Sequence, residues 1–241
     1  MTEGSKAADA RTVRAALAEL ADPERAAWTA PYLGVVPGGY GEGDVLLGIP
    51  VPGQRRVART ARDLPLEEAA TLLASPVHEH RFTALVVLVD RYRRSRDPAL
   101  RAGLSRFYLG HRGGVDNWDL VDTSAPDLLG GELVDGDRTI LGELAGAERL
   151  WDRRIAVVST LALIRQGELD ETFALAERVM ADPHHLIHKA VGWMLREAGK
   201  RDERALVAFL ETHRAGMPRT MLRYAIERLS PERRAALMAR A

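Results

Sequence analysis

The fold of this chain is decided by two apolar segments, residues 82–89 (FTALVVLV) and 155–164 (IAVVSTLALI). Helical periodicity dominates the sequence from residue 64 onward, and both segments lie within it. Each one therefore predicts a helix that is apolar almost all round. Such helices are covered on both sides, as in the inner layers of stacked helix pairs.

The rest of the sequence predicts further helices with short connections. Pairs of an N-cap residue and a proline mark starts after Ser75, Asp97 and Ser230, and Pro126 should close the helix that precedes it. Pairs of helices recur roughly every 35–45 residues, which fits degenerate HEAT-like units. We expect helices at residues 7–21, 23–30, 54–62, 66–74, 76–95, 98–109, 116–123, 137–145, 149–166, 170–181, 186–199, 202–214, 219–229 and 231–240.

Length and composition bound the class of protein. The 241 residues suffice for a substantial core, and we expect one all-α domain over residues 1–241, with residues 1–6 disordered. The absence of cysteine excludes disulfides and thiolate metal sites. No run approaches about 18 apolar residues, and residues 1–8 lack the apolar region of a signal peptide. We therefore expect a cytoplasmic protein with no membrane contact.

The charge is balanced overall but unevenly distributed. The 34 basic and 34 acidic residues give a net charge of zero, which taken alone argues against nucleic-acid binding. Residues 151–241 hold 16 basic and 12 acidic residues, a net of +4, which leaves −4 for residues 1–150. This asymmetry weakens the objection, because a groove needs local positive potential rather than a basic whole. Nearly all of the positive charge is arginine, which suits bidentate phosphate contacts, although a GC-rich genome would give the same bias.

Trp118 and Asp122 form the pair of residues that points most clearly to a site. Their i,i+4 spacing on a helix stacks the indole beside the carboxylate. Leu120 and Val121 point elsewhere, so the helix has a core face without the indole. Two interpretations are open: a ligand site, or a boundary tryptophan at the rim of a repeat with Asp122 capping the next helix.

Trp193 is the second tryptophan that lies off the expected core face. It shares one side of its helix with Lys189, Arg196 and Lys200. An indole among cations suits stacking and contact with a DNA backbone. The alternative is a solvated basic face that carries one stray aromatic residue. The opposite, apolar side holds Ala190, Val191, Met194, Leu195 and Ala198.

Trp151 differs from these two tryptophans, because Ile155 and Val158 share its helix face. We expect Trp151 to be core. Arg154 lies at the edge of that face, where its guanidinium could reach into a concave groove. We expect Arg153 to be solvated or paired with an acid.

The remaining polar residues and the glycine-rich segment give weaker evidence for a functional site than the tryptophans do. The histidines at 78, 80, 184, 185 and 188 include no His-Glu-x-x-His pattern, and capping or packing explains them better than a metal. No serine sits in a nucleophile elbow. The glycine-rich segment 36–44 is not followed by Gly-Lys-Ser/Thr, so it predicts a loop rather than a phosphate cradle, with Tyr40 as its one functional candidate.

These stretches also resemble a known family. Residues 117–122 (NWDLVD), 150–156 (LWDRRIA) and 186–197 look like the signature stretches of the AlkD family of bacterial DNA alkylation repair glycosylases. Residues 39–44 (GYGEGD), 75–81 (SPVHEHR) and 217–224 (MPRTMLRY) resemble the family too. The similarity runs in the family's order from about residue 38 to residue 229.

The resemblance implies an α-solenoid of HEAT-like helix pairs with a concave DNA-binding face. It implies an enzyme without cofactor or metal that releases N3- or N7-alkylated purines, bulky adducts included, from double-stranded DNA in base excision repair. We expect such a protein to be monomeric and to associate with the nucleoid when it acts on DNA. Asp116 and His185 depart from the family's pattern, where many relatives have asparagine and an acidic residue.

Carried over residue by residue, the resemblance makes Asp122 the catalytic carboxylate and Trp118 and Trp193 the residues that pack on the sugar. Arg154 becomes a phosphate or active-site contact. These four residues should converge on one concave surface. The DNA-binding candidates are Lys189, Arg196 and Tyr40.

Chemistry supports this assignment, because an alkylated purine is already cationic and leaves as a neutral base. One carboxylate then suffices to stabilise the oxocarbenium-like sugar and to orient water. The family leaves the damaged base stacked, in contrast to base flipping. The competing hypothesis is a helical-repeat module that binds DNA or protein without catalysis.

Overall fold

The computed structural model describes residues 8–239, and these residues are all-helical. They contain no strand, and the one extended pairing among them is an isolated parallel bridge between Val45 and Val77. Helices pack against their near neighbours in the chain, which gives a fold of the α-solenoid type. The predicted fold class is therefore confirmed, whereas the disorder predicted for residues 1–6 lies outside the described residues.

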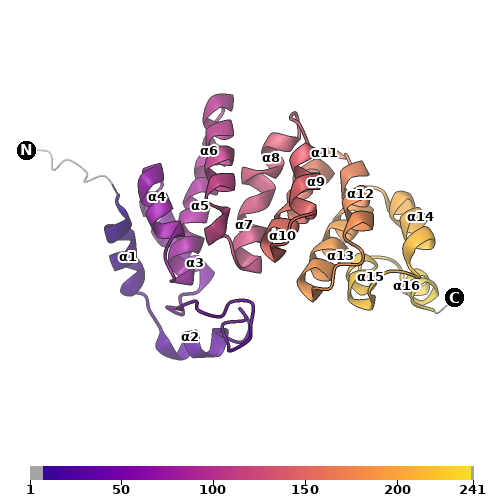
Figure 1. The fold of residues 1–241 in the computed structure, drawn as a ribbon, viewed down its shortest axis with the longest axis horizontal. Helices are drawn as coiled ribbons and strands as arrows, with labels where there is room; N and C mark the ends of the chain where they lie inside the picture. The colour runs from indigo at the N-terminus through magenta and orange to yellow at the C-terminus, as the bar shows by residue number, and fades with distance from the viewer. Residues whose placement is uncertain (1–7, 240–241) are drawn as a thin grey trace, which may run out of the picture. The chain divides into compact units, whose positions relative to one another are not determined.

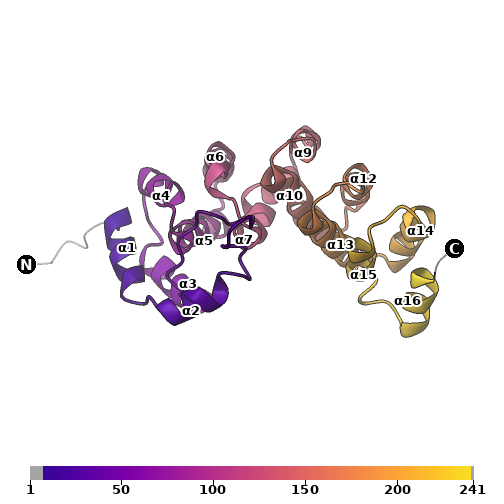
Figure 2. The same ribbon diagram turned by 60° about the horizontal axis from the view of Figure 1, so that its bottom comes forward.

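The chain divides into two compact units, Met1–Ser124 and Ala125–Ala241. The boundary falls within helix α7, and a single domain over residues 1–241 stays a prediction. In the first unit, α4 and α6 form one layer and α3, α5 and α7 form the other (Figure 2). Its elements are α1 (Ala10–Ala18), α2 (Pro23–Thr29), α3 (Val51–Thr60), α4 (Leu66–Leu73), α5 (His78–Arg94), α6 (Pro98–Gly110), the short 3₁₀ helix η1 (Arg112–Gly114) and the start of α7 (Trp118–Leu128) (Figure 1).

The second unit repeats this two-layered arrangement. Helix α13 packs against α10, α12, α14 and α15, and α10 also packs against α9. Its helices after α7 are α8 (Gly130–Leu133), α9 (Thr139–Ala145), α10 (Leu150–Ser159), α11 (Leu161–Gln166), α12 (Asp170–Arg178), α13 (His185–Gly199), α14 (Glu203–His213), α15 (Arg219–Ala225) and α16 (Pro231–Met238).

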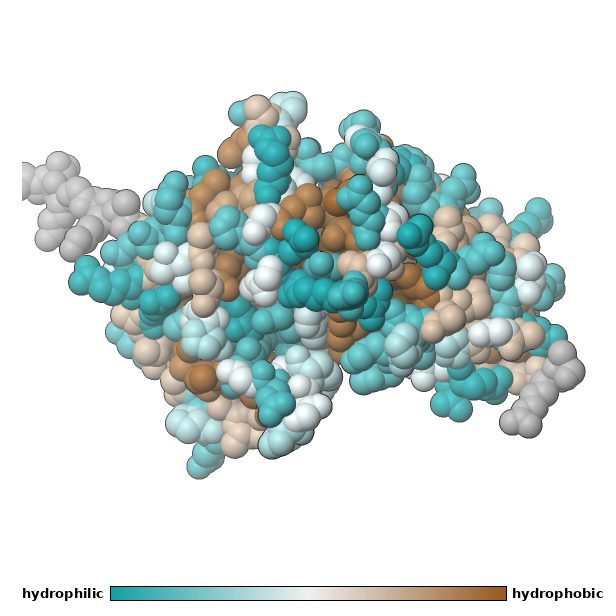
Figure 3. Space-filling view, viewed as in Figure 1, coloured by the Kyte–Doolittle hydropathy of each residue, from teal (hydrophilic) through white to brown (hydrophobic). Residues whose placement is uncertain are grey.

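The two apolar segments lie at the centre of these units, as predicted. Every residue of 82–89 in α5 is buried, and so is every residue of 155–164 in α10 and α11. Burial of this apolar surface is the main favourable term for each unit. In the space-filling view, hydrophilic residues cover much of the visible face, and apolar residues show in smaller areas among them (Figure 3).

Two expectations about helix ends were wrong. Pro126 does not close its helix, because α7 continues to Leu128. A proline inside a helix removes one backbone hydrogen bond, and here the burial of Ala125 and Leu128, both 0 % exposed, outweighs that loss. The helix expected at 149–166 breaks at Thr160, whose hydroxyl donates to the Val157 carbonyl at 2.7 Å.

Helix α8 was not expected at all, because its Gly-Gly start resembles a turn. Gly130 lies so close to α10 that a Cβ there would come within 2.3 Å of the Ser159 carbonyl oxygen. Only glycine allows this approach, so the residue reflects close packing rather than a turn.

No helix among the described residues is long and apolar enough to cross a membrane.

Candidate active site

Trp118 is the first residue of α7, and its backbone is fixed by the residue before it. The Trp118 N–H donates to the side-chain oxygen of Asn117 at 2.8 Å. The amide nitrogen of Asn117 donates in turn to the Leu33 carbonyl at 2.9 Å, and Asn117 is fully buried. The start of α7 is thereby held against the segment that follows α2.

The faces of α7 follow the sequence pattern. Leu120 and Val121 are both 0 % exposed. This confirms the prediction that they form the core face of the helix and that the indole of Trp118 is not needed for it. Trp118 and Asp122 are half-buried and lie one turn apart. Trp118 also contacts the ring of Tyr32 edge-on, with centroids 5.3 Å apart and planes at 85°. Two aromatic rings, one from α7 and one from the segment after α2, therefore lie beside the first turn of α7, which leads to Asp122.

Tyr40 organises the loop that carries Tyr32. Its hydroxyl donates to the Tyr32 carbonyl at 3.0 Å. Its ring lies over Gly34, which has a φ of 69° and whose added Cβ would come within 2.7 Å of that ring. The loop predicted at 36–44 is confirmed, and Tyr40 has a structural role within it. Direct contact of Tyr40 with DNA stays a prediction.

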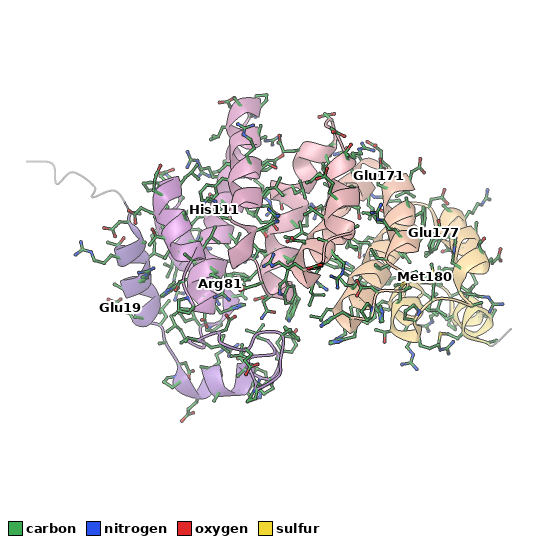
Figure 4. The ribbon with its side chains drawn as sticks, in the orientation of Figure 1. Glu19, Arg81, His111, Glu171, Glu177 and Met180 are labelled. Atoms are coloured by element: carbon green, nitrogen blue, oxygen red, sulfur yellow. The ribbon has the colours of Figure 1, made fainter. Side chains whose placement is uncertain are left out.

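Five side chains from the loop, α5 and the start of α7 form a largely buried ionic cluster, which we call the His78 cluster. His78 donates from Nε2 to Asp119 at 2.9 Å and contacts Asp44 through Nδ1 at 3.4 Å. Arg81, near the N-terminal end of α5 (Figure 4), pairs with Asp44 at 2.6 Å and with Asp116 at 3.1 Å. The cluster ties the glycine-rich loop and α5 to the helix that carries Trp118.

The carboxylates of the His78 cluster keep the His78 side chain protonated. Burial lowers the pKa of His78, but the charge and hydrogen bond of Asp119 and the hydrogen bond of Asp44 outweigh it and raise that pKa to about 9. Burial acts to raise the pKa of Asp44, yet its contacts with His78 and Arg81 lower it overall. His78 is therefore a cation at neutral pH, and Asp44 an anion.

Trp193 lies in the second unit, half-buried on α13. Its indole N–H donates to Glu197 at 3.2 Å. A shallow pocket of about 500 Å³ opens beside it, and its remaining lining residues come from α11 and from the end of α13 onward. Glu197 was not among the residues predicted for this face, and it brings a negative charge to a face that was expected to hold only cations.

The basic side chains around Trp193 differ in whether they form ion pairs within the protein. Arg196 forms ion pairs with Glu227 and, at 3.6 Å, with Glu197. Lys200 pairs with Glu197 at 2.7 Å. The Lys189 side chain has no hydrogen bond or ion pair with any residue in 8–239. Lys189 is therefore the cation on this face that is best placed to accept a phosphate.

Arg154 is only 4 % exposed. Its guanidinium donates to the Leu186 carbonyl at 2.6 Å, so it joins α10 to the first turn of α13. This burial favours positioning of α13 over direct contact with a phosphate. Trp151 is 6 % exposed and belongs to the core, and Arg153 pairs with Asp182 at 2.6 Å, so both expectations are confirmed.

The histidines at the start of α13 act in capping and packing, as expected. His184 accepts the Leu186 N–H at 3.2 Å, and His188 donates to the Asp182 carbonyl at 2.6 Å. His185 stacks on His184, with ring centroids 4.9 Å apart. Within the described part of the chain, no group of three His, Cys, Asp or Glu residues could hold a metal ion.

Two exposed aromatic residues escaped the sequence analysis. Tyr32 is 65 % exposed and Trp28 on α2 is 76 % exposed. Trp28 lies on α2, which buries none of its residues, so its indole has no core to pack against. Tyr32 adds directly to the candidate site through its contact with Trp118.

The candidate residues are distributed over both units. Trp118 and Asp122 belong to the first unit, whereas Arg154 and Trp193 belong to the second. Their convergence on one concave surface stays a prediction.

The fold and the α7 site define an all-helical protein of the α-solenoid type that presents an indole one turn before a carboxylate. A sequence model of the DNA alkylation repair enzymes matches residues 13–229, and the chain belongs to that family. The solved structure of a predicted DNA alkylation repair enzyme from Enterococcus faecalis has the same fold, with a TM-score of 0.67 at 19 % identity. The match covers 88 % of this chain and 97 % of that one. No curated protein matches the sequence.

Proposed function

We propose that this protein is a DNA glycosylase that releases N3- or N7-alkylated purines from double-stranded DNA. Membership in its family supports the more general description, a DNA alkylation repair enzyme whose partner is DNA. The observation that carries the finer one is the half-buried Trp118–Asp122 pair, flanked by Tyr32 and held by the His78 cluster. A scaffold has no need of a carboxylate at the end of an aromatic surface.

The reaction that fits this pair is hydrolysis of the N-glycosidic bond. The bond electrons pass to the cationic purine, which leaves neutral, and the sugar becomes oxocarbenium-like. The Asp122 carboxylate stabilises this positive charge and orients a water molecule. Water adds to C1′ and loses a proton, which leaves an abasic site for base excision repair. Because the leaving group is already charged, no general acid is required.

The aromatic residues and cations serve DNA in this proposal. The ring faces of Trp118 and Trp193 hold the cationic nucleotide through CH–π and cation–π contacts. Contact through the sugar and backbone leaves the damaged base stacked, so bulky adducts are tolerated. Arg154 positions α13, while Lys189 and, more weakly, Arg196 and Tyr40 bind the backbone. The enzyme needs no cofactor and works as a monomer on HEAT-like helix pairs.

The test is to incubate the purified full-length protein with duplex DNA containing N7-methylguanine and to measure free base by chromatography. We expect release of N7-methylguanine and none of unmodified guanine from a matched duplex. Binding of both duplexes without release of base would refute the enzyme and favour the non-catalytic helical-repeat module.

A further inference from the structure

A pocket of about 210 Å³ lies in the first unit between α3, α5 and α7. Its floor is apolar, with Ala58, Val86 and Val89, and Thr123 of α7 borders it. Thr123 directly follows Asp122, so the pocket adjoins the helix of the candidate active site. None of its lining residues belongs to the site described above.

Arginines dominate the rim of this pocket. Arg55 and Arg59 are exposed, lie one turn apart on α3 and both line it, as does the exposed Arg93 of α5. Within residues 8–239, neither the Arg55 nor the Arg59 side chain has a hydrogen bond or an ion pair. Two guanidinium groups thus face the pocket without an internal counter-charge.

One acidic residue, Asp90, also lines the pocket. Its carboxylate is engaged by Arg94 at 2.7 Å, one turn further along α5. Because Asp90 is already paired with Arg94, the side chains of Arg55 and Arg59 contribute positive charge at the rim that no acidic residue in 8–239 neutralises. The local potential is therefore positive although the chain is neutral overall.

We infer that this pocket binds a phosphate group of the DNA backbone next to the α7 site. Arginine forks match the geometry of phosphate oxygens, and the threonine hydroxyl supplies a further donor. The open, exposed rim suits a phosphate within a polymer. The inference rests on the proposed function only in taking DNA as the ligand, and inorganic phosphate shares the same chemistry.

The test replaces both unpaired arginines, as Arg55→Gln with Arg59→Gln, and measures binding of an undamaged duplex by fluorescence anisotropy over a range of salt concentrations. Loss of one phosphate contact should lower the slope of log K against log salt by about 1. We expect about tenfold weaker binding at low salt, with circular dichroism showing that the variant stays folded.

The control removes two arginines of the same kind that do not line the pocket, as Arg56→Gln with Arg106→Gln. Both are exposed, and Arg56 lies on the same helix as the tested pair. An equal effect in this control, or an unchanged slope in the test variant, would overturn the inference.

A second measurement distinguishes the source of the phosphate. Thermal unfolding is followed in inorganic phosphate and in chloride at equal ionic strength. If phosphate stabilises the wild type through Arg55 and Arg59 while the DNA slope is unchanged, the pocket serves free phosphate and the DNA inference fails. Because undamaged DNA is bound without reaction, a wild type that releases no base refutes the proposed function and leaves this inference intact.

Discussion

His78 lies between two carboxylates at the base of α7, and its charge should contribute to stability. Because its folded pKa of about 9 is above the ordinary value of 6.5, this contribution is complete below pH 6.5 and is lost as the pH rises through 9. His78→Gln should therefore cost on the order of 3 kcal/mol at pH 6, and less as the pH increases. Urea unfolding of both proteins between pH 6 and 10 measures this difference.

His80→Gln is the matched control, because the pKa of His80 is lowered overall, chiefly by burial, whereas the carboxylates raise the pKa of His78. The cost of that substitution should not change above pH 7. A cost of His78→Gln that also stays constant across this range would show that the His78 charge does not stabilise the protein.

Trp118 should contribute less to the proposed reaction than Asp122, because it positions the nucleotide and carries no charge. Contacts between an aromatic ring and a cation are worth roughly 0.5–1 kcal/mol at exposed sites and about 2 kcal/mol when desolvated, so Trp118→Ala should slow release of N7-methylguanine by about 30-fold. Single-turnover rates of base release measure this. A slower rate for Trp118→Ala than for Asp122→Asn would make the indole the principal group.

Individual residues were predictable where helix periodicity decides their place. It separated Leu120 and Val121 from Trp118 and Asp122, and it assigned Trp151 to the core. It could not find the Tyr32 contact, because that contact joins distant segments. It also could not explain Asp116, which departs from the family pattern and pairs with Arg81 here.

Among the elements, helix positions were more predictable than helix ends. Capping residues placed the start of α6 correctly, where Asp97 accepts the Ala99 N–H at 2.9 Å. The passage of α7 through Pro126, the break at Thr160 and the short helix α8 depend on packing between helices. Local propensities do not report such packing.

Helix α13 offers a test of which cations bind DNA. Lys189→Gln should weaken binding of damaged and undamaged duplexes alike, by several-fold at about 50 mM salt, and should lower the salt slope by about 1. Arg196→Gln should have a smaller effect, because Glu227 and Glu197 already engage its guanidinium. Anisotropy titrations with both duplexes measure this order. An effect of Lys189→Gln on damaged DNA alone would assign Lys189 to recognition of the lesion.

For the whole molecule, the all-helical fold and the alkylation repair family followed from periodicity and from six motifs in order. Whether Trp118 and Asp122 converge with Trp193 on one surface stays a prediction, because these residues belong to different compact units.

The proposed chemistry also restricts the substrates. Bases that are uncharged before they leave, such as O-alkylated pyrimidines, should be released far more slowly than N7-methylguanine, because the enzyme supplies no acid. Parallel assays with duplexes that differ only in the lesion measure this preference. Equal rates would require a general acid that the mechanism does not contain.

The most direct test of the central claim is the rate of N7-methylguanine release by Asp122→Asn compared with the wild type. The variant keeps the size of the side chain but removes the charge that opposes the oxocarbenium, so release should fall by about 10²-fold or more. Duplex binding should be retained, and Asp135→Asn, the same change at an exposed carboxylate, should leave the rate unaltered. Undiminished release by Asp122→Asn would contradict the catalytic role of this carboxylate.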